Sequence, residues 1–306
     1  MTKYLYYILL LMLSLNSHAQ PTGTHIIVLG VAQDGGYPHM GCTKKCCTMA
    51  WEHDSMSRYV VSLALVDPES KRWWLFEATP DIKQQLHYFQ TLTKGQYAYL
   101  PTGIFITHAH IGHYTGLMEF GKEVMNTKPI PVYALSKMNA FLESNGPWSQ
   151  LVTQFNIDLR DMMVDTPIIL SGHIRVGAFI VPHRDEFSET AGFKIITDNK
   201  KYLFIPDINK WEQWDRSILN EVKTVDVALL DGTFFDNTEL PDRNMSEVPH
   251  PFVSETMDLF KNESKDTKSK IHFIHLNHTN PLLWDTQKQN EVKKAGFNIA
   301  MQGQEL

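Results

Sequence analysis

The chain has 306 residues, of which 43% are hydrophobic and 20% are charged, a composition typical of a globular protein with a sizeable core. Its formal net charge is −6 at pH 7, and its Lys and Arg residues form no clustered stripe. These features argue against binding to nucleic acid or to an anionic membrane surface, because both need an excess of positive charge.

Residues 1–19 have the pattern of a secretory signal. One cation, Lys3, precedes an apolar run from Tyr4 to Leu15, and small residues follow up to Ala19. The run is shorter than the roughly 20 residues that a spanning helix needs, so cleavage is favoured over a retained membrane anchor. We therefore expect residues 20–306 to form one domain that works outside the cytoplasm, in the periplasm, with no stable membrane insertion.

Beyond this segment, short apolar runs typical of strands alternate with amphipathic runs typical of helices. Strands are expected over 25–30, 60–67, 72–78, 103–108, 130–135, 173–182, 192–197, 201–206, 226–232 and 270–276. Helices are expected after Pro80, after Gly112, and over 209–219, 252–260 and 286–295. Residues 198–199 predict a hairpin turn, and the hydrophilic run 261–270 predicts a solvated turn. This order predicts an α/β fold with two sheets in the middle and helices outside.

Three cysteines, Cys42, Cys46 and Cys47, lie within the single segment "GCTKKCCTM". An odd number of cysteines in an exported chain cannot be fully paired internally, and a bridge between two adjacent cysteines would be strained. Two interpretations stay open. One is a Cys42–Cys46 disulfide with Cys47 free, and the other is a metal clamp completed by a distant fourth ligand.

The segment "FITHAHIGHYTGL" (105–117) places His108, His110 and His113 between an expected strand and an expected helix. Ligands at the end of a strand are held by the strand and remain open to solvent through the loop. Three further candidates each follow an apolar strand, namely His183, Asp207 and His275. Together these residues predict one metal cleft built from the ends of several strands.

These residues, with Glu77 in "LFEATPD", resemble the metallo-β-lactamase-fold hydrolase superfamily. The stretches "VLGVAQDGGYPHMGC", "EATPDIKQQL", "THAHIGHYTGL", "LLDGTFF" and "IHLNHTNPLL" make the chain most similar to the pyrroloquinoline-quinone biosynthesis protein B family, from about residue 25 to 300. The resemblance implies a four-layer αββα sandwich with the metals at one edge of the two sheets. It implies a first metal position formed by His108, His110 and His183, a second formed by His113 and His275, and Asp207 between them.

The superfamily motif carries an aspartate at the position of Gly112. Glycine offers no donor atom, so we expect the first metal position to fill more tightly than the second. The expected cofactors are one or two Zn²⁺ ions at the histidines, whose donors also suit iron or manganese, and one structural zinc elsewhere. Even one metal on three histidines can lower the pKa of a bound water toward about 7.

The resemblance also gives roles to residues around the metals. Related phosphodiesterases of this fold pair a histidine such as His278 with an early cysteine cluster, which implies a structural zinc on Cys42, Cys46, Cys47 and His278. His250 matches a histidine of the related family and is expected to act with Asp207 in catalysis; an exposed loop histidine is the alternative. Glu77 and Asp231 are expected to support the ligand histidines from behind.

The function expected from these features is an exported metal-dependent hydrolase acting on a small-molecule substrate. A metal-bound hydroxide would attack an ester, a lactone or a phosphodiester. Two alternatives remain open: an iron-dependent oxidative modification of a peptide or quinone precursor, as the family resemblance allows, and a non-catalytic metal-binding protein. The sequence determines neither the substrate nor the oligomeric state.

Overall fold

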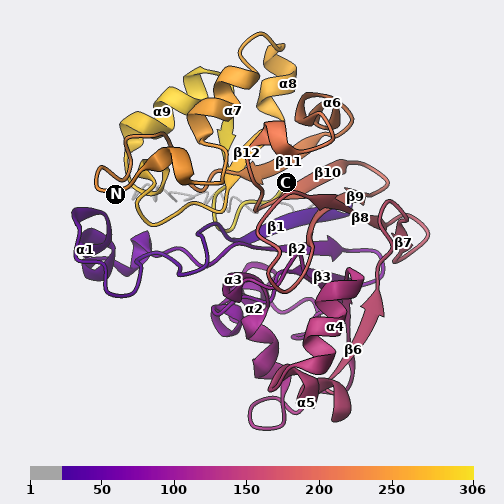
Figure 1. Ribbon diagram of the computed structural model, residues 1–306. Coiled ribbons are helices and arrows are strands. Elements are labelled where there is room, and N and C mark those ends of the chain that lie inside the picture. Colours follow the sequence, from indigo (N-terminus) through magenta and orange to yellow (C-terminus); the bar gives the residue numbers. More distant parts are fainter. Residues whose placement is uncertain (1–22) are drawn as a thin grey trace, which may run out of the picture.

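The computed structural model describes residues 23–306, so the predicted signal over residues 1–19 lies outside the described residues. Two β-sheets lie face to face, and helices cover their outer faces, so the protein has the expected four-layer αββα architecture (Figure 1). In the described part of the chain, no helix has both the length and the apolar character needed to cross a membrane.

The first sheet has six strands in the order β1-β2-β3-β4-β5-β6. They are β1 (His25–Gly30), β2 (Ser62–Asp67), β3 (Arg72–Phe76), β4 (Gly103–Phe105), β5 (Ile130–Ala134) and β6 (Ile157–Asp161). Strands β1 to β3 pair antiparallel, and β3 to β6 pair parallel. Its outer face packs against α2 (Ile82–Leu92), α4 (Ser136–Ser144) and α5 (Trp148–Thr153). Because both faces are covered, β2 is apolar over most of its length rather than alternating.

The second sheet has seven strands in the order β13-β12-β11-β10-β9-β8-β7. They are β7 (Ile168–Ile169), β8 (Arg175–Val181), β9 (Thr190–Ile196), β10 (Lys201–Ile205), β11 (Val227–Asp231), β12 (Ile271–Ile274) and β13 (Asn298–Ile299). Strands β10 to β13 are parallel, and β9 is antiparallel to both β8 and β10. The turn at 198–199 joins β9 to β10, which confirms the predicted hairpin. This sheet packs against α6 (Ile218–Lys223), α7 (Val253–Leu259) and α9 (Thr286–Lys294).

Aromatic side chains join the two sheets. Phe76 and Phe105 of the first sheet meet Phe193 of the second edge to face, with ring centroids 5.5 and 5.7 Å apart. All three side chains are fully buried, and such pairs contribute about 0.5–1.5 kcal/mol beyond their buried area. These contacts fix how the sheets face each other, and so they fix which strand ends share an edge.

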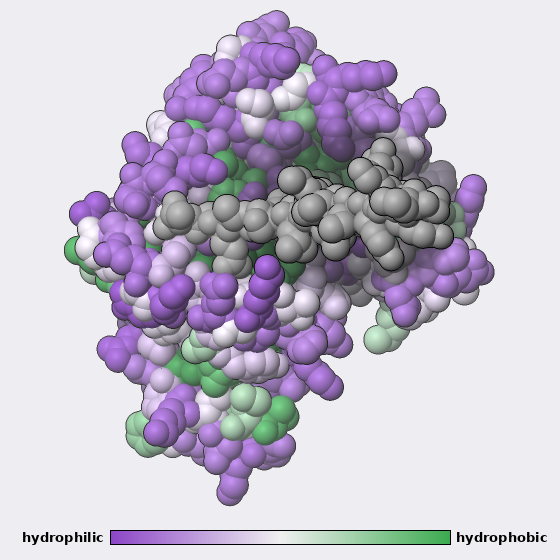
Figure 2. Space-filling model, turned by 180° about the vertical axis from the view of Figure 1, so that it is seen from behind, coloured by the Kyte–Doolittle hydropathy of each residue, from purple (hydrophilic) through white to green (hydrophobic). Residues whose placement is uncertain are grey.

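Several elements differ from the sequence-based expectation. Residues 261–270 contain α8 (Lys265–Ser269), which forms because the Ser264 side chain accepts a hydrogen bond from the Thr267 backbone N–H at 3.1 Å. The expected helix over 209–219 is replaced by a short 3-10 turn at Trp211–Gln213 and by α6, which begins at Ile218. Helices α1 (Lys45–Glu52), α4 and α5 and strands β6, β7 and β13 were not predicted, and α3 (Ile111–Tyr114) is short. Figure 2 shows a mostly hydrophilic outer surface, with apolar spots near the end that holds α5.

Candidate metal centre

The predicted metal ligands come together at one edge of the sandwich. Each follows the carboxyl end of a strand, with His108 and His110 after β4, His183 after β8, Asp207 after β10 and His275 after β12. Strand β8 runs in the same direction as β10 and β12, because β9 is antiparallel to β8 and β10. Their ends therefore meet at one edge, and the buried strands hold the side chains in place.

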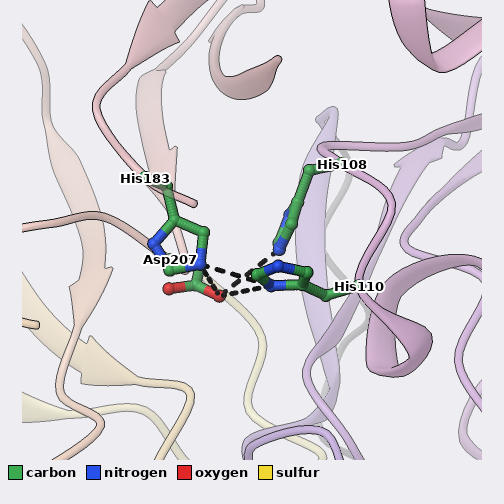
Figure 3. Close-up of side chains that lie close together, drawn as sticks. All are labelled: His108, His110, His183 and Asp207. Atoms are coloured by element: carbon green, nitrogen blue, oxygen red, sulfur yellow. Dashed lines mark hydrogen bonds and ion pairs between the residues drawn. The ribbon is translucent and has the colours of Figure 1, made fainter. Parts of the chain in front are cut away.

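The first donor set consists of His108, His110, His183 and Asp207, which point toward one another (Figure 3). The Asp207 Oδ2 atom lies 3.4 Å from His108 Nε2 and 3.2 Å from His183 Nε2. His110 Nδ1 lies 3.3 Å from His183 Nε2 and 3.9 Å from the same Asp207 oxygen. Four ligands at about 2.0–2.1 Å around a tetrahedral ion are roughly 3.3–3.4 Å apart. The observed separations therefore fit one metal ion.

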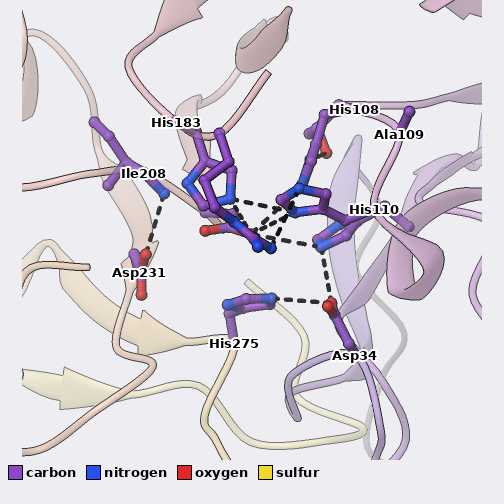
Figure 4. Close-up of polar contacts among 12 residues, drawn as sticks. Asp34, His108, Ala109, His110, His183, Ile208, Asp231 and His275 are labelled. Carbon is purple, nitrogen blue, oxygen red and sulfur yellow. Dashed lines mark hydrogen bonds and ion pairs between the residues drawn. The ribbon is translucent and has the colours of Figure 1, made fainter. Parts of the chain in front are cut away.

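The second donor set contains a ligand that the sequence did not predict. Asp34 lies in the loop after β1, and its Oδ1 atom is 3.2 Å from His113 Nε2. The same oxygen lies 3.6 Å from His275 Nε2 (Figure 4). Asp207 Oδ2 lies 3.9 Å from His113 Nε2 and so stands between the two sets, as expected. The second set thus has its own carboxylate. The expectation that Gly112 leaves the second metal position without a carboxylate ligand is therefore wrong.

Gly112 is explained by the position of Asp34. A Cβ atom at residue 112 would lie 2.2 Å from Asp34 Oδ1 and 2.6 Å from Asp34 Cα. The loop that carries Asp34 therefore occupies the space that a side chain at 112 would need. Asp34 thus supplies a carboxylate beside the position where the motif of the resembled superfamily carries an aspartate, and glycine at 112 is needed for this close approach.

The charges of the centre suit a cation. Although burial opposes it, His113 and His275 hold the pKa of Asp34 well below its usual range. Burial likewise opposes ionisation of Asp207, but the neighbouring histidines, His183 first, hold its pKa well below the usual range. Burial and the adjacent His113 lower the pKa of His108. Ionised carboxylates beside a neutral imidazole are the ligand forms that divalent metals require.

Buried donor atoms without hydrogen-bond partners gather at this edge. They belong to Asp34, Glu77, His108, His113, Asp207 and His275. Buried polar atoms in native proteins are normally satisfied, so a cluster of orphaned atoms needs a ligand to explain it. The donors present here, imidazole nitrogens and carboxylate oxygens, fit Zn²⁺ as well as iron or manganese.

Supporting residues orient the histidines. Glu77 is fully buried, and its Oε1 atom lies 3.5 Å from His113 Nδ1. Asp231 Oδ1 accepts a hydrogen bond from the Thr233 hydroxyl at 2.7 Å, and the same hydroxyl oxygen lies 2.9 Å from His275 Nδ1. These contacts have the geometry expected of Glu77 and Asp231 as supports, since they fix the ring orientation of each ligand.

Two of these residues have strained backbones. Glu77 has φ +68° and His275 has φ +62°, although neither is glycine. Left-handed conformations of this kind cost about 1–3 kcal/mol and persist where the surrounding structure imposes them. Glu77 and His275 lie on opposite sides of the centre. We infer that the contacts of their side chains there outweigh the free-energy cost of the left-handed backbone.

His250 lies beside the metal donors and is buried, not an exposed loop histidine. Its Nδ1 atom is 2.9 Å from Asp231 Oδ2 and 3.2 Å from Asp207 Oδ1. Burial alone lowers the pKa of His250, but these two carboxylates raise it to about 10. The Nδ1 atom of His250 thus contacts both carboxylates and holds the ring between them.

The cysteine segment forms a separate donor set. Cys42, Cys47 and His278 have donor atoms within 4.8 Å of one another. Cys46 stands outside this group, although its Sγ lies 4.0 Å from Cys42 Sγ. All three cysteines are free thiols, so the alternative Cys42–Cys46 disulfide does not form in this structure. The His39 ring stacks on His278 with centroids 4.3 Å apart and borders the set.

The comparisons agree with this architecture. A family model described as the β-lactamase superfamily domain matches residues 72–275. The coenzyme PQQ synthesis protein B of Methylorubrum extorquens (strain PA1) is 24% identical over 306 residues, which cover 91% of this chain and 98% of that protein.

Two solved structures share the fold. The zinc-bound PqqB from Methylobacterium extorquens is similar with a TM-score of 0.75 and 22% identity, covering 92% of this chain and 99% of that chain. A diphosphatase from the PhnP family is similar with a TM-score of 0.63 and 19% identity, covering 92% and 96%.

Proposed function

Because the chain belongs to the β-lactamase superfamily, we propose that it is a metal-dependent hydrolase acting on an ester, a lactone or a phosphodiester of a small molecule. The observation that carries this proposal is the pair of adjoining donor sets that share Asp207. The Asp207 Oδ2 atom lies within 3.9 Å of donor nitrogens from both sets. Such an arrangement serves hydrolysis better than a single closed structural site, which leaves no position for substrate.

The residues around the donors have separable tasks. A divalent cation bound here supplies a Lewis acid and lowers the pKa of water toward about 7. Asp207 lies between the two sets, where its carboxylate can accept a hydrogen bond from the attacking water. His250 uses Nδ1 for both carboxylate contacts, so Nε2 is the nitrogen left to donate a proton to the leaving group.

The test is hydrolysis of three chromogenic classes by purified protein with Zn²⁺ or Mn²⁺. The substrates are bis(p-nitrophenyl) phosphate, p-nitrophenyl butyrate and a chromogenic lactone. We expect at least one to be hydrolysed and its hydrolysis to be lost in His110→Ala. We expect His250→Gln to lower kcat by about 10²–10⁴-fold with metal content unchanged. Activity that survives in His110→Ala would contradict the proposal, and Lys83→Gln, an exposed change on α2, is the control.

A second function is favoured by the similarity to coenzyme PQQ synthesis protein B. In this alternative the histidine site holds iron and takes part in oxidative modification of a peptide or quinone precursor, because histidine and carboxylate donors suit iron as well as zinc. Metal analysis of protein purified without added metal distinguishes the two functions. Iron at the histidine site together with metal-dependent oxygen consumption would favour oxidation, whereas zinc or manganese with hydrolysis would favour the first proposal.

We also propose that the protein is exported to the periplasm. The support is the cation, apolar run and small-residue ending within residues 1–19. Cell fractionation with terminal sequencing tests this, and a chain that keeps its first residues in the cytoplasm would contradict it.

A further inference from the structure

A cleft of about 700 Å³ opens between the metal centre and the cysteine donor set formed by Cys42, Cys47 and His278. His250 lies at the end of the cleft near the metal centre and His278 at the end near the cysteine donor set. Gln33, the neighbour of Asp34, also lines it. The cleft therefore adjoins the atoms at which hydrolysis would occur. A substrate held at the metals would extend its remaining part into this space.

The charged lining of the cleft is mainly positive. Lys44, Arg184 and Arg243 line it, and Glu247 is the one carboxylate among the lining residues that the structure describes. Glu247 is already engaged, since its Oε1 accepts a hydrogen bond from the Asn244 side chain at 2.8 Å. This positive excess lies in a chain whose net charge is −6, and a cleft of one sign attracts a ligand of the other.

The cations are available to a ligand. Within residues 23–306, neither Lys44 nor Arg243 forms an ion pair, whereas Lys194, Lys210 and Lys223 each do. Arg184 borders the metal donors, with one guanidinium nitrogen 3.4 Å from His110 Nε2 and another 3.8 Å from the exposed Glu186 carboxylate. The three side chains thus present donors on both sides of the cleft, from the segment before α1, the loop after β8 and the loop between β11 and α7.

One wall of the cleft is held in place by contacts of the loop between β11 and α7. The loop between β11 and α7 has a small apolar core of Phe234, Met245, Val248 and Phe252. Glu239 ties this loop to the loop after β12, because its carboxylate accepts hydrogen bonds from the Phe235 backbone N–H at 2.6 Å and from the Thr279 hydroxyl. Leu240, which is partly exposed, and the nearly buried Phe234 also line the cleft, so an apolar surface stands beside the cations.

We propose that this cleft binds the part of the substrate beyond the scissile bond, and that this part is a short organic chain ending in an anionic group. The anion is a carboxylate or a phosphate held by Lys44, Arg184 and Arg243, and the organic chain packs on Leu240 and the exposed edge of Phe234. This inference rests on the proposed hydrolytic function and specifies its substrate class.

The test compares three p-nitrophenyl esters of equal length, the butyrate, the hemisuccinate and the 3-phosphonopropionate, which end in a methyl, a carboxylate and a phosphonate. In wild type we expect kcat/KM for at least one anionic ester to exceed that for the butyrate by about 10-fold or more. In Lys44→Gln/Arg243→Gln we expect this preference to fall by about 10-fold, so that the anionic and the methyl-ended esters become nearly equal, with the butyrate changed less than about twofold. The matched control is Lys83→Gln/Arg175→Gln, which removes two exposed cations away from the cleft.

A binding measurement separates this inference from hydrolysis. Calorimetry with the free acids 3-phosphonopropionate, succinate and butyrate should show tighter binding of a dianion by wild type, and no such preference in the double variant. Equal affinities in wild type and variant would overturn the cleft assignment even if the butyrate ester is hydrolysed. A retained anion preference without hydrolysis of any ester or phosphodiester would overturn the hydrolytic function and keep the cleft as an anion site.

Discussion

Asp34 supplies the carboxylate of the second donor set, and its removal should empty that position selectively. In Asp34→Asn the side chain keeps its size, but the negative charge 3.2 Å from His113 Nε2 and 3.6 Å from His275 Nε2 is lost. Two neutral imidazoles and the shared Asp207 then remain for the ion. Changes to residues that only support a ligand already weaken metal binding by about 10–100-fold, so loss of a direct ligand should cost more than about 100-fold, or about 2.7 kcal/mol.

The assay is a calorimetric titration of metal-free protein with Mn²⁺, an ion that prefers nitrogen and oxygen donors over the thiolates of the cysteine segment. We expect wild type to show two binding events. In Asp34→Asn the event that belongs to the second donor set should be lost, and the other should be kept. The control is Asp215→Asn, which changes an exposed carboxylate. Two events of unaltered affinity in Asp34→Asn would refute the assignment of Asp34 as a ligand.

Three further changes test other parts of the structure. Gly112→Asp restores the superfamily motif but should lower the free energy of unfolding by about 1–3 kcal/mol, because the new Cβ would lie 2.6 Å from Asp34 Cα. Urea unfolding measures this free energy, and an unchanged midpoint would contradict the close approach. Burial raises the pKa of Glu239 from 4.5 to about 7. Between these two pH values the folded state therefore binds one more proton than the unfolded state. The free energy of unfolding should fall by up to about 3 kcal/mol as the pH rises from about 4.5 to 7. Unfolding at several pH values should show this slope in wild type, and Glu239→Gln should flatten it; equal slopes would argue against it. Cys47→Ser should remove about one zinc ion per chain while Mn²⁺ binding at the histidines persists, and elemental analysis that finds the same zinc content would exclude Cys47 as a ligand.

The strand ends could be predicted because apolar runs mark strands and polar residues directly after them mark an edge. His108, His183 and His275 each follow such a run, and the structure brings all three to one edge. The αββα layering followed from the same alternation, together with the family resemblance. Local pattern was sufficient for these residues because the strand itself sets where its last side chain goes.

Asp34 could not be predicted in the same way. It lies two residues after Ala32, which forms isolated β-bridges with Val60 and Leu276, and so it stands in a loop rather than directly at a strand end. Its role depends on the tertiary contact with Gly112. The available signal was the conflict at Gly112 itself, where a donor was missing and a small residue stood instead. A glycine at a ligand position indicates that another part of the chain approaches closely.

Helices α4 and α5 were missed for another reason. Only a few of their apolar residues are buried, namely Met138 and Leu142 in α4 and Leu151 in α5, and each helix is short. Tertiary packing against the first sheet stabilises them, and single-sequence periodicity carries little information about such segments. The reverse error occurred over 209–219, where a helix was predicted. Trp211 and Trp214 are instead buried and hold a short 3-10 turn in place.

The short segment from Asp34 to Cys47 contacts both donor sets, since Asp34 faces the histidine centre while Cys42 and Cys47 face His278. We therefore expect metal binding at the two donor sets to be coupled. An ion that orders this segment at one end lowers the entropy cost of ordering it at the other, and the same factor must operate in both directions. Removal of zinc from the cysteine donor set should therefore weaken metal binding at the histidines. The segment from Asp34 to Cys47 would then couple the affinities of the two sites.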